Sequence, residues 1–484
     1  MDLHLHAGEP GSHVIEVYRQ LREAIVTGRL RANDRLPPTR TLAADLGVAR
    51  ATVTAVYERL VAEGLAEGRT GSGTFVSATV QPLHRRSGRA VASRTRVPAG
   101  IELPVAPAPD RPAAMRHDLR LGRPDPALAP LREWRKLMVA ALSRSDLLRA
   151  PYHAAGEPEL REAIAAHLGR SRGMALDAQD VVITRGTGQA LDLIARGLLR
   201  PGARVVMESP GYPDAYAAFA AAGARIVGVP VDVEGLDIER LPATATLLYC
   251  TPSHQAPTGA VLSLSRRIAL LEWARRTGAW IIEDDYDTEY RWEQRVLDPL
   301  RTLDGSGRVI YLGSISKVLT PRVRVGWVAA TPEVRAAMLR IKGWSDPFGE
   351  RPVQLAMARF IDDGRLALHV RRSAATYGTR RAVTLQNVGT HLPDLAVVPG
   401  AAGLHIALTY PAATGRSRAR GARVLAELTE ACAARGIAIR TIRQVAATVE
   451  PHACEGLVVG FGAIPAASLP EAIAGVASCL AEIA

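Results

Sequence analysis

The chain of 484 residues is roughly two to three times longer than an ordinary single domain, so we expect at least two domains, each with its own core. Its formal net charge of +12 favours a polyanionic partner where the charge is clustered, although an arginine-rich, lysine-poor composition is also what codon bias would give. The polar opening and the lack of an apolar run of about 18 residues predict a soluble cytoplasmic protein without a membrane span, and four scattered cysteines predict neither disulfides nor a bound metal.

Three helices are expected near the N-terminus. Apolar residues at three- and four-residue intervals predict an amphipathic helix over about residues 14–25, which ends before Gly28. A short helix is expected over Thr39–Leu46 and another over about Arg50–Glu63, with a turn at Gly47 between them. Two helices joined by a short turn that contains glycine form a helix-turn-helix, with a plain three-helix subdomain as the alternative.

The second helix of this pair has the features of a DNA-recognition helix. Such a helix enters the major groove with its first residues on base edges, which here are Arg50, Thr52 and Thr54. Arginine can form two hydrogen bonds with guanine, and threonine can bond a phosphate or contact a thymine methyl group. The start of the helix carries no acidic residue, which favours DNA binding over the plain subdomain.

A glycine-rich hairpin is expected directly after these helices. The segment GLAEGRTGSGTFV predicts a β-hairpin wing whose tip can approach the sugar-phosphate backbone closely. The tip residues are Arg69, Gly71, Ser72 and Gly73. Through LPPTRTLAADLGVARATV and GSGTFV, residues 12–76 resemble the winged helix-turn-helix of the GntR family of bacterial regulators. The resemblance implies that Arg40, the recognition helix and the wing tip contact double-stranded operator DNA.

A linker and an α/β domain are expected beyond the wing. Residues 77–117 are rich in proline and arginine, which predicts an extended connector whose arginines add at most non-specific attraction to DNA. From residue 118 onward, apolar runs rich in β-branched residues alternate with amphipathic helices, which predicts a largely parallel sheet. The expected strands are VVIT (181–184), RVVMES (204–209), RIVGV (225–229), TLLYC (about 247–251), AWIIED (279–284) and RVIYL (308–312).

Chemically suggestive residues follow several of these strands, where ligands bind in such folds. Taken singly, each has a plain interpretation: glycines before a helix form a turn, Asp284 and Asp285 form an acidic turn, and Lys317 is a solvated loop lysine. Together they match the needs of pyridoxal 5′-phosphate (PLP), with Lys317 as the amine for a Schiff base and Asp284 as the partner of the pyridinium nitrogen. Tyr286 is the candidate donor to the phenolate oxygen and Tyr212 the candidate for stacking on the ring. The candidates around the phosphate are Thr187, Gly188, Ser314 and Arg324.

These residues resemble the site of fold-type-I aminotransferases, with SISKVLTPRVRVGW as the lysine motif and a match over about residues 118–484. The resemblance implies a homodimer in which Tyr152 of one subunit reaches the cofactor phosphate of the other. The two halves together, with the segment TPSHQAPTGAVLSLSRR, resemble the MocR/GabR class of GntR-family transcriptional regulators. We therefore expect a multidomain chain with a winged helix-turn-helix at 1–76, a linker at 77–117 and an α/β aminotransferase-like domain at 118–484.

The sequence departs from the aminotransferase pattern in two places. Ala256 stands where transaminases carry an asparagine that bonds the phenolate oxygen, so that bond is lost or passes to His254 or Gln255. Val458 stands where we expect the arginine that binds the substrate carboxylate, and Arg440 or Arg443 either substitutes for it or lies on the surface. Efficient transamination is therefore not expected, whereas a Schiff base with PLP needs neither group.

Three functions remain open at this point. The first is a regulator that senses PLP, alone or with an amino acid or amine effector, and so controls vitamin B6 or amino-compound metabolism. The second is an active PLP-dependent aminotransferase with an ancillary DNA-binding domain. The third keeps the DNA binding but gives the large domain a different ligand. The sequence favours the first.

Overall fold

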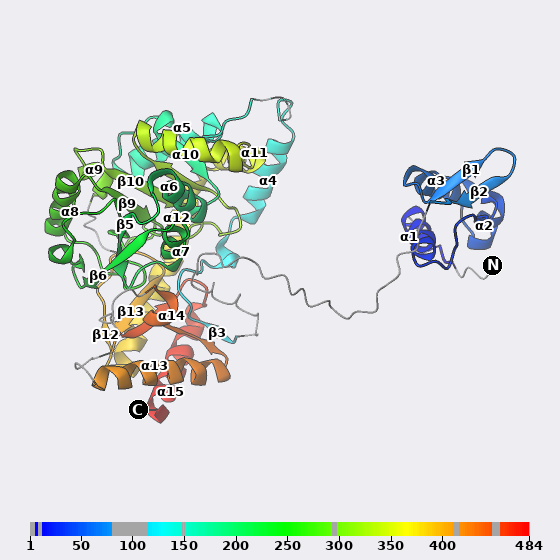
Figure 1. Cartoon of the computed structure of the whole chain (residues 1–484). Helices are drawn as coiled ribbons and strands as arrows, with labels where there is room; N and C mark the ends of the chain where they lie inside the picture. Colours follow the sequence, from blue (N-terminus) through cyan, green and yellow to red (C-terminus); the bar gives the residue numbers. More distant parts are fainter. Residues whose placement is uncertain are drawn as a thin grey trace. The chain divides into compact units, whose positions relative to one another are not determined.

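The computed structural model describes residues 5–7, 12–79, 115–147, 149, 151–292, 298–410, 416–447 and 455–483. The chain divides into two units, Met1–Pro98 and Ala99–Ala484 (Figure 1). Most of the linker expected at 77–117 lies outside the described residues. At its two ends, the backbone amide of Ser77 donates to the carbonyl of Leu65, and His117 belongs to a strand of the second unit.

The first unit is a three-helix fold with a two-stranded wing, as the hydrophobic spacing predicts. Its elements are α1 (His13–Val26), α2 (Thr39–Leu46), α3 (Arg50–Ala62), β1 (Ala66–Arg69) and β2 (Gly73–Val76). Val17, Leu21, Val53 and Leu60 are fully buried in a core that the three helices share. Gly47 ends α2 in the left-handed conformation, with φ 65°, so the chain turns at once toward α3.

The second unit is built around an eight-stranded mixed sheet with the order β4-β11-β10-β9-β8-β5-β6-β7. The strands are β4 (Val181–Thr184), β5 (Arg204–Ser209), β6 (Arg225–Asp232), β7 (Gly235–Leu236), β8 (Leu247–Cys250), β9 (Trp280–Asp285), β10 (Val309–Ser314) and β11 (Gly326–Ala329). The pairs formed by β5, β6, β8, β9 and β10 are parallel, whereas β7 and β11 run antiparallel to their neighbours. The predicted α/β class is confirmed, and the run TLLYC lies at 246–250, one residue earlier than expected.

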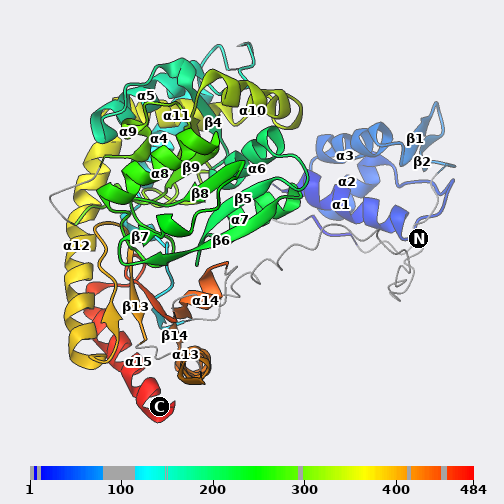
Figure 2. The ribbon, with the colours of Figure 1, turned by 60° about the vertical axis from the view of Figure 1, so that its left-hand side comes forward.

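Helices cover both faces of this sheet (Figure 2). One face packs Val182, Ile282 and Leu312 against α6 (Thr187–Leu198), α7 (Pro213–Ala221) and α10 (Pro332–Ser345). The other face packs Ile183 and Tyr311 among buried residues of α4 (Leu131–Leu142), α5 (Pro158–Arg172) and α11 (Arg351–Asp362). On the same face, Val206, Leu248 and Ile281 share a core cluster with α8 (Leu264–Thr277). Because successive strand residues point to opposite faces, neighbours on one strand serve different layers.

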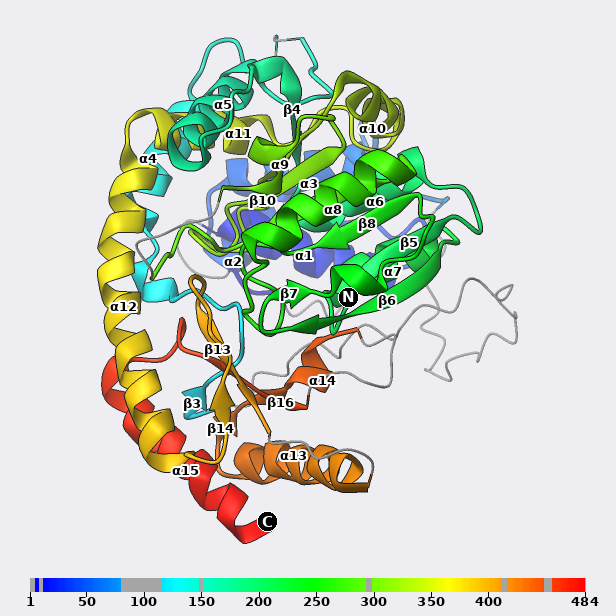
Figure 3. The same cartoon turned by 90° about the vertical axis from the view of Figure 1, so that its left-hand side faces the viewer.

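A smaller C-terminal part completes this unit. The 27-residue helix α12 (Arg365–His391) runs down one side of the whole second unit, from α11 to α15 (Leu469–Ile483) (Figure 3). A four-stranded sheet has the order β12-β13-β16-β15, formed by β12 (Ala396–Val397), β13 (His405–Thr409), β15 (Arg440–Thr441) and β16 (Gly456–Gly460). The remaining elements include α9 (Leu300–Leu303), α13 (Arg416–Ala434), α14 (Ile442–Val445), and the parallel pair β3 (His117–Asp118) and β14 (Ile437–Ala438).

One helical segment of the described chain, Ala466–Ile483, is long and apolar enough to span a membrane on length and composition alone. In this structure it packs against α12 and α13. Its residues Leu469, Ile473 and Val476 are buried in the C-terminal core cluster.

Candidate cofactor site and DNA-binding surface

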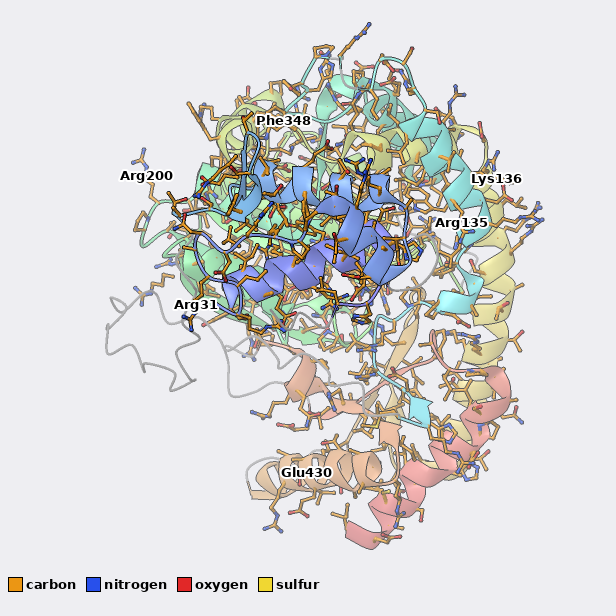
Figure 4. The ribbon with its side chains drawn as sticks, turned by 90° about the vertical axis from the view of Figure 1, so that its right-hand side faces the viewer. Arg31, Arg135, Lys136, Arg200, Phe348 and Glu430 are labelled. Carbon is orange, nitrogen blue, oxygen red and sulfur yellow. The ribbon has the colours of Figure 1, made fainter. Side chains whose placement is uncertain are left out.

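Lys317 lies in the loop between β10 and β11, where its Nζ donates to the carbonyl of Gly122 at 2.8 Å. The other two lysines have different surroundings. Lys136 is exposed on α4 (Figure 4), and the buried Lys342 of α10 has its Nζ 3.6 Å from the Asp346 carboxylate. Within the described chain, no carboxylate forms an ion pair with Lys317, so its amine remains available to a ligand.

The surroundings of Lys317 shift its amine toward the neutral form relative to a lysine in water. Burial lowers the pKa of the Lys317 amine, while the carboxylates of Asp287 and Asp284 act in the opposite direction. The neutral amine is the form that attacks an aldehyde, so a lowered pKa raises its reactive fraction. The loop itself is anchored by Ile315 and Val318, which are buried in the core with α5 and α11.

Asp284 offers an unused carboxylate oxygen inside the site. Its Oδ2 accepts a hydrogen bond from the hydroxyl of Tyr249 at 2.7 Å, while its buried Oδ1 has no partner among the described residues. Burial raises the pKa of Asp284 to about 7. A buried acceptor without a donor is costly, and a pyridinium N–H is a donor of the kind that Oδ1 lacks. This position therefore fits PLP.

Open space lies beside the N-terminus of α6. Gly186 caps the helix with φ 85°, and no side chain caps the first free amides. A Cβ built on Gly188 would meet no atom within 4 Å, so the space beside the first turn is open. A Cβ on Gly186 would lie 3.4 Å from Nη1 of Arg324, and no described carboxylate pairs with this arginine. Cofactors with a phosphate fit such a cradle of amides, the Thr187 hydroxyl and a guanidinium.

Ser314 belongs to the same region of the fold. It is the last residue of β10 and pairs with Gly326 of β11. A Cβ on Gly326 would lie 2.8 Å from the Cα of Gly186, so these three backbones approach one another closely. The predicted phosphate residues therefore come together, although they are separated by more than a hundred residues in the chain.

Two predicted tyrosines also lie near this site: Tyr212, predicted to stack on the ring, and Tyr286, predicted to donate to the phenolate oxygen. Tyr212 precedes α7, and its hydroxyl donates to Asp214 at 2.8 Å. Burial raises the pKa of Tyr212. The charges of Asp284, the candidate partner of the ring nitrogen, and of Arg324, the candidate phosphate ligand, both act on the Tyr212 hydroxyl. The Tyr212 side chain is therefore close enough to both parts of the site to feel their charges. The hydroxyl of Tyr286 lies 3.3 Å from Nδ1 of His254.

The structure distinguishes the two residues considered in place of the missing asparagine. The amide nitrogen of Gln255 donates to Glu208 and to the carbonyls of Pro210 and Ala256, and its amide oxygen accepts from Thr258. Gln255 is therefore fully engaged in holding its own loop. His254, by contrast, keeps a buried Nε2 without a partner among the described residues.

Two buried residues next to His254, Asp287 and His405, were not predicted from the sequence. Nδ1 of His254 lies 2.9 Å from Asp287, and the His254 and His405 rings have centroids 4.7 Å apart. Nε2 of His405 lies 3.1 Å from the carbonyl of Pro257, and its Nδ1 has no partner in the described chain. Asp287 was within reach of sequence reasoning, because it is one residue from the predicted Tyr286. His405 carries no local pattern and reaches the site only through the fold.

The substrate-carboxylate arginine has no replacement at the expected place. Val458 is fully buried in the centre of β16, where it pairs with Ala407 on one side and with Arg440 on the other. Arg443 forms an ion pair with Glu455. Arg440 therefore lies on the strand next to Val458, not at its position. The Arg443 guanidinium already pairs with the Glu455 carboxylate in place of a substrate carboxylate.

Tyr152 does not contact these groups within its own chain. It is 75% exposed, and its ring lies against Phe348, with ring centroids 4.2 Å apart (Figure 4 labels Phe348). A tyrosine with this exposure is free to contact another molecule. Its predicted reach to a partner's phosphate stays a prediction.

The predicted DNA-contacting residues lie on the surface of the first unit. Arg40 and Arg50 are exposed, and Thr52 is half-buried. Nε of Arg50 donates to the Thr39 hydroxyl at 3.3 Å, and the Thr54 hydroxyl donates to the carbonyl of Arg50 at 3.0 Å. The start of α3 thus presents one free guanidinium end, while the Thr54 hydroxyl keeps only its acceptor lone pairs for a ligand.

The wing tip is exposed, whereas the side chain of its arginine, Arg69, is fixed by contacts within the same unit. Gly71, Ser72 and Gly73 are exposed between β1 and β2, and the two glycines have positive φ. Nη2 of Arg69 donates to Asn33 at 2.7 Å, and its guanidinium also binds Glu67 and lies over the Phe75 ring. Arg69 therefore stiffens the wing in addition to presenting charge there.

Comparisons with known proteins agree with this arrangement. Residues 14–76 match the family described as bacterial regulatory proteins, gntR family, and residues 116–454 match aminotransferase class I and II. The solved structures that this chain resembles include an archaeal alanine:glyoxylate aminotransferase, with TM-score 0.68 and 29% identity over 76% of this chain and 91% of that one. The kynurenine aminotransferase of Pyrococcus horikoshii gives TM-score 0.67 and 27% identity over 75% and 90%.

Fold and site together define a class of protein: a GntR-type DNA-binding domain fused to an aminotransferase fold. The chain is 36% identical to the "Probable rhizopine catabolism regulatory protein MocR" of Rhizobium meliloti over 82% of this chain and 81% of that one. It is 36% identical to the regulator TauR of Rhodobacter capsulatus (84% and 86%), and 34% identical to the pyridoxine biosynthesis regulator PdxR of Corynebacterium glutamicum (84% and 84%). The chain belongs to the MocR/GabR-type transcriptional regulators of the GntR family.

Proposed function

We propose that this regulator binds operator DNA through its winged helix-turn-helix and senses PLP through the aminotransferase fold. The observation that carries the proposal is the Lys317 amine, whose pKa is lowered by burial, in a site where Asp284 keeps an unpaired buried oxygen. When bound, PLP supplies an aldehyde that captures an amine. Lys317 holds the cofactor and Asp284 orients its ring nitrogen. Thr187, Gly188, Ser314 and Arg324 receive the phosphate, Tyr286 the phenolate oxygen, and Tyr212 stacks on the ring.

The signal in this proposal is PLP itself or an amino compound that reacts with it. Relatives named for pyridoxine biosynthesis and for rhizopine catabolism support the two versions. In either version the ligand must bind two arrangements of the protein with different affinity in order to change operator binding. The proposed setting is a cytoplasmic homodimer whose two heads bind paired half-sites.

An active aminotransferase is the second candidate function, supported by the fold match to such enzymes. Two observations weigh against turnover. Val458 is a buried aliphatic residue where the clamp arginine is expected, and Arg443 is paired with Glu455. Without a bidentate partner, the α-carboxylate of an amino acid is poorly oriented for proton removal.

A trapping experiment tests the proposal. Purified protein is mixed with PLP, reduced with borohydride and digested, and the pyridoxyl adduct is located by mass spectrometry. We expect the adduct on Lys317 and its loss in Lys317→Ala, with Lys342→Ala as the matched control. A DNA footprint with and without PLP is measured on the same samples. An adduct on another residue, or a footprint indifferent to PLP, contradicts the sensing role, and sustained turnover of an amino acid with a keto acid favours the enzyme.

A further inference from the structure

A second cavity lies on the opposite face of β9 from the cofactor site. Its volume is about 240 Å³. The walls come from α5, from the residues that follow β9, and from the loop 399–402 that leads into β13. Its charged and hydroxyl-bearing lining residues are Arg172, Arg267, Arg291, Asp285, Ser253 and Thr288. The cavity therefore joins the large sheet to the C-terminal part of the same unit.

Two of its three arginines are already satisfied. Nε of the buried Arg172 lies 2.8 Å from Asp285, and its Nη2 lies 3.1 Å from Glu289. The fully buried Arg267 donates to three backbone carbonyls, those of Leu262, Pro252 and Asp298, at 2.8–3.0 Å. These contacts fix both guanidinium groups in the wall.

Arg291 is different because, among the described residues, the two terminal nitrogens of its guanidinium have no hydrogen-bond partner. Its Nε donates to the carbonyl of Thr288 at 2.9 Å, and its backbone forms an isolated β-bridge with Ala402. Within the described chain it makes no ion pair. Burial lowers the pKa of Arg291 and the nearby Arg172 adds to this effect, while the carboxylates of Asp285 and Glu289 act in the opposite direction.

We propose that this cavity binds a small oxyanion, the phosphate or carboxylate group of a metabolite, through the guanidinium of Arg291. A partly buried guanidinium whose terminal nitrogens have no described partner gains two charge-assisted hydrogen bonds when such a group binds. Ser253 supplies a hydroxyl in the same wall, whereas the Thr288 hydroxyl already donates to Asp285, and the Asp285 carboxylate is paired with Arg172. The apolar Val233 and Val261 give room for a short carbon skeleton.

The position makes this site separate from the PLP site. Asp284 faces the layer of α6 and α7, whereas Asp285, the next residue, faces the cavity. A ligand in the cavity contacts both the sheet and the loop 399–402, so it can bias how the C-terminal part sits on the sheet. The proposal does not depend on PLP binding.

Calorimetry of the full chain tests the site with inorganic phosphate and, separately, malonate, at an ionic strength held constant with chloride. Because the cradle at Arg324 also attracts phosphate, the titrations use the PLP-loaded chain and the Arg324→Gln variant. We expect one saturable site per chain that survives Arg324→Gln and is weakened at least about tenfold by Arg291→Gln. Whichever anion binds identifies the ligand group as phosphate or carboxylate.

Two further variants make the outcome decisive. Arg308 matches Arg291, because it also makes one hydrogen bond to a carbonyl and no described ion pair, so Arg308→Gln should bind as the parent does. Val233 is 68% exposed at the cavity rim, and Val233→Trp should block entry while leaving Arg291 intact. The proposal is overturned if neither anion binds saturably, or if Arg291→Gln and Val233→Trp bind as tightly as Arg308→Gln does.

Discussion

Asp284 and Asp285 are consecutive residues of β9, yet their carboxylates serve opposite faces of the sheet. Asp284 accepts a hydrogen bond from Tyr249, and Asp285 accepts one from Nε of Arg172 at 2.8 Å. The period of two along a strand assigns one carboxylate to a ligand site and the other to a buried ion pair. Removing one or the other charge should therefore have different consequences.

We expect Asp284→Asn to weaken PLP binding with little loss of stability. The variant replaces a carboxylate whose Oδ1 is free, so it removes a charge-assisted bond to the ring nitrogen worth about 1.5–3 kcal/mol. The measurement is the dissociation constant of PLP, from the absorbance change on titration. An unchanged constant would mean that another group pairs with the ring nitrogen.

We expect the reverse pattern for Asp285→Asn. This change leaves the buried Arg172 with Glu289 as its only described ion-pair partner. Breaking a buried ion pair lowers the free energy of unfolding by roughly 3–5 kcal/mol. Because Glu289 still pairs with Arg172 in the variant, we expect a loss near the lower end of that range. Urea unfolding of the PLP-free protein measures this loss, with Asp284→Asn as the control. Equal stability of the two variants would show that Glu289 alone satisfies the arginine.

PLP binding should strengthen as the pH rises through neutrality. Burial raises the pKa of Asp284 to about 7 in the ligand-free protein, far above its value in an unfolded chain. At pH values below its pKa in the unfolded chain, Asp284 contributes its full stability, and this contribution is lost as the pH rises through about 7. The reason is that the buried ionised form then has Tyr249 as a donor to Oδ2 but no described donor to Oδ1. A pyridinium partner removes that cost, so the benefit of PLP appears as the carboxylate ionises.

Thermal unfolding with and without PLP, at several pH values from about 6 to about 8, measures this effect. The rise in Tm caused by PLP should grow with pH and should grow less in Asp284→Asn. The lowered pKa of Lys317 acts in the same direction, so Lys317→Ala separates the two contributions. A shift in Tm that is independent of pH in the parent would contradict the assignment.

Local patterns were sufficient to predict the elements that carry the site. The helix predicted at Thr39–Leu46 and the strand predicted at 181–184 have the predicted bounds in the structure. Both were predictable because a glycine that ends a helix and the spacing of apolar residues depend only on a few neighbouring residues. The same reasoning placed Asp284 at the end of a strand and Lys317 in the loop after another, and in the structure β9 extends one residue further, to Asp285. Because β9 and β10 are parallel neighbours, their carboxyl ends bring the two residues to the same edge of the sheet.

Contacts set by tertiary packing could not be predicted in this way. His405 joins His254 because β13 is brought against the loop before α8, and nothing near either residue indicates it. Likewise, the sequence left open whether the bond to the phenolate oxygen is lost or passes to His254 or Gln255. The network of Glu208, Pro210 and Thr258 that occupies Gln255 exists only in the folded chain.

Arg50 should contribute to the choice of DNA sequence if it reads a base. Its exposed guanidinium lies at the start of α3 and is tethered by a bond from Nε to Thr39, which leaves both terminal nitrogens for guanine. We expect Arg50→Ala to cost about 1–3 kcal/mol on the operator and much less on unrelated DNA. Competitive binding at one fixed salt concentration measures both affinities. Arg19→Ala on α1, where the arginine pairs with Glu16, controls for the lost charge. A uniform loss on all sequences would make Arg50 a phosphate contact.

Tyr152 should act on the PLP of the other subunit in the proposed dimer. Its ring is held by Phe348 but remains 75% exposed, so its hydroxyl is free to reach a phosphate across an interface. We expect Tyr152→Phe to weaken PLP binding by about 1.5–3 kcal/mol, the value of a hydrogen bond to a charged group. Mixed dimers give the decisive comparison. When a Tyr152→Phe subunit pairs with a Lys317→Ala subunit, the first keeps its own lysine and receives an intact tyrosine, so its PLP affinity should return to that of the parent. A contact within one chain predicts instead that the affinity stays weak in the mixed dimer.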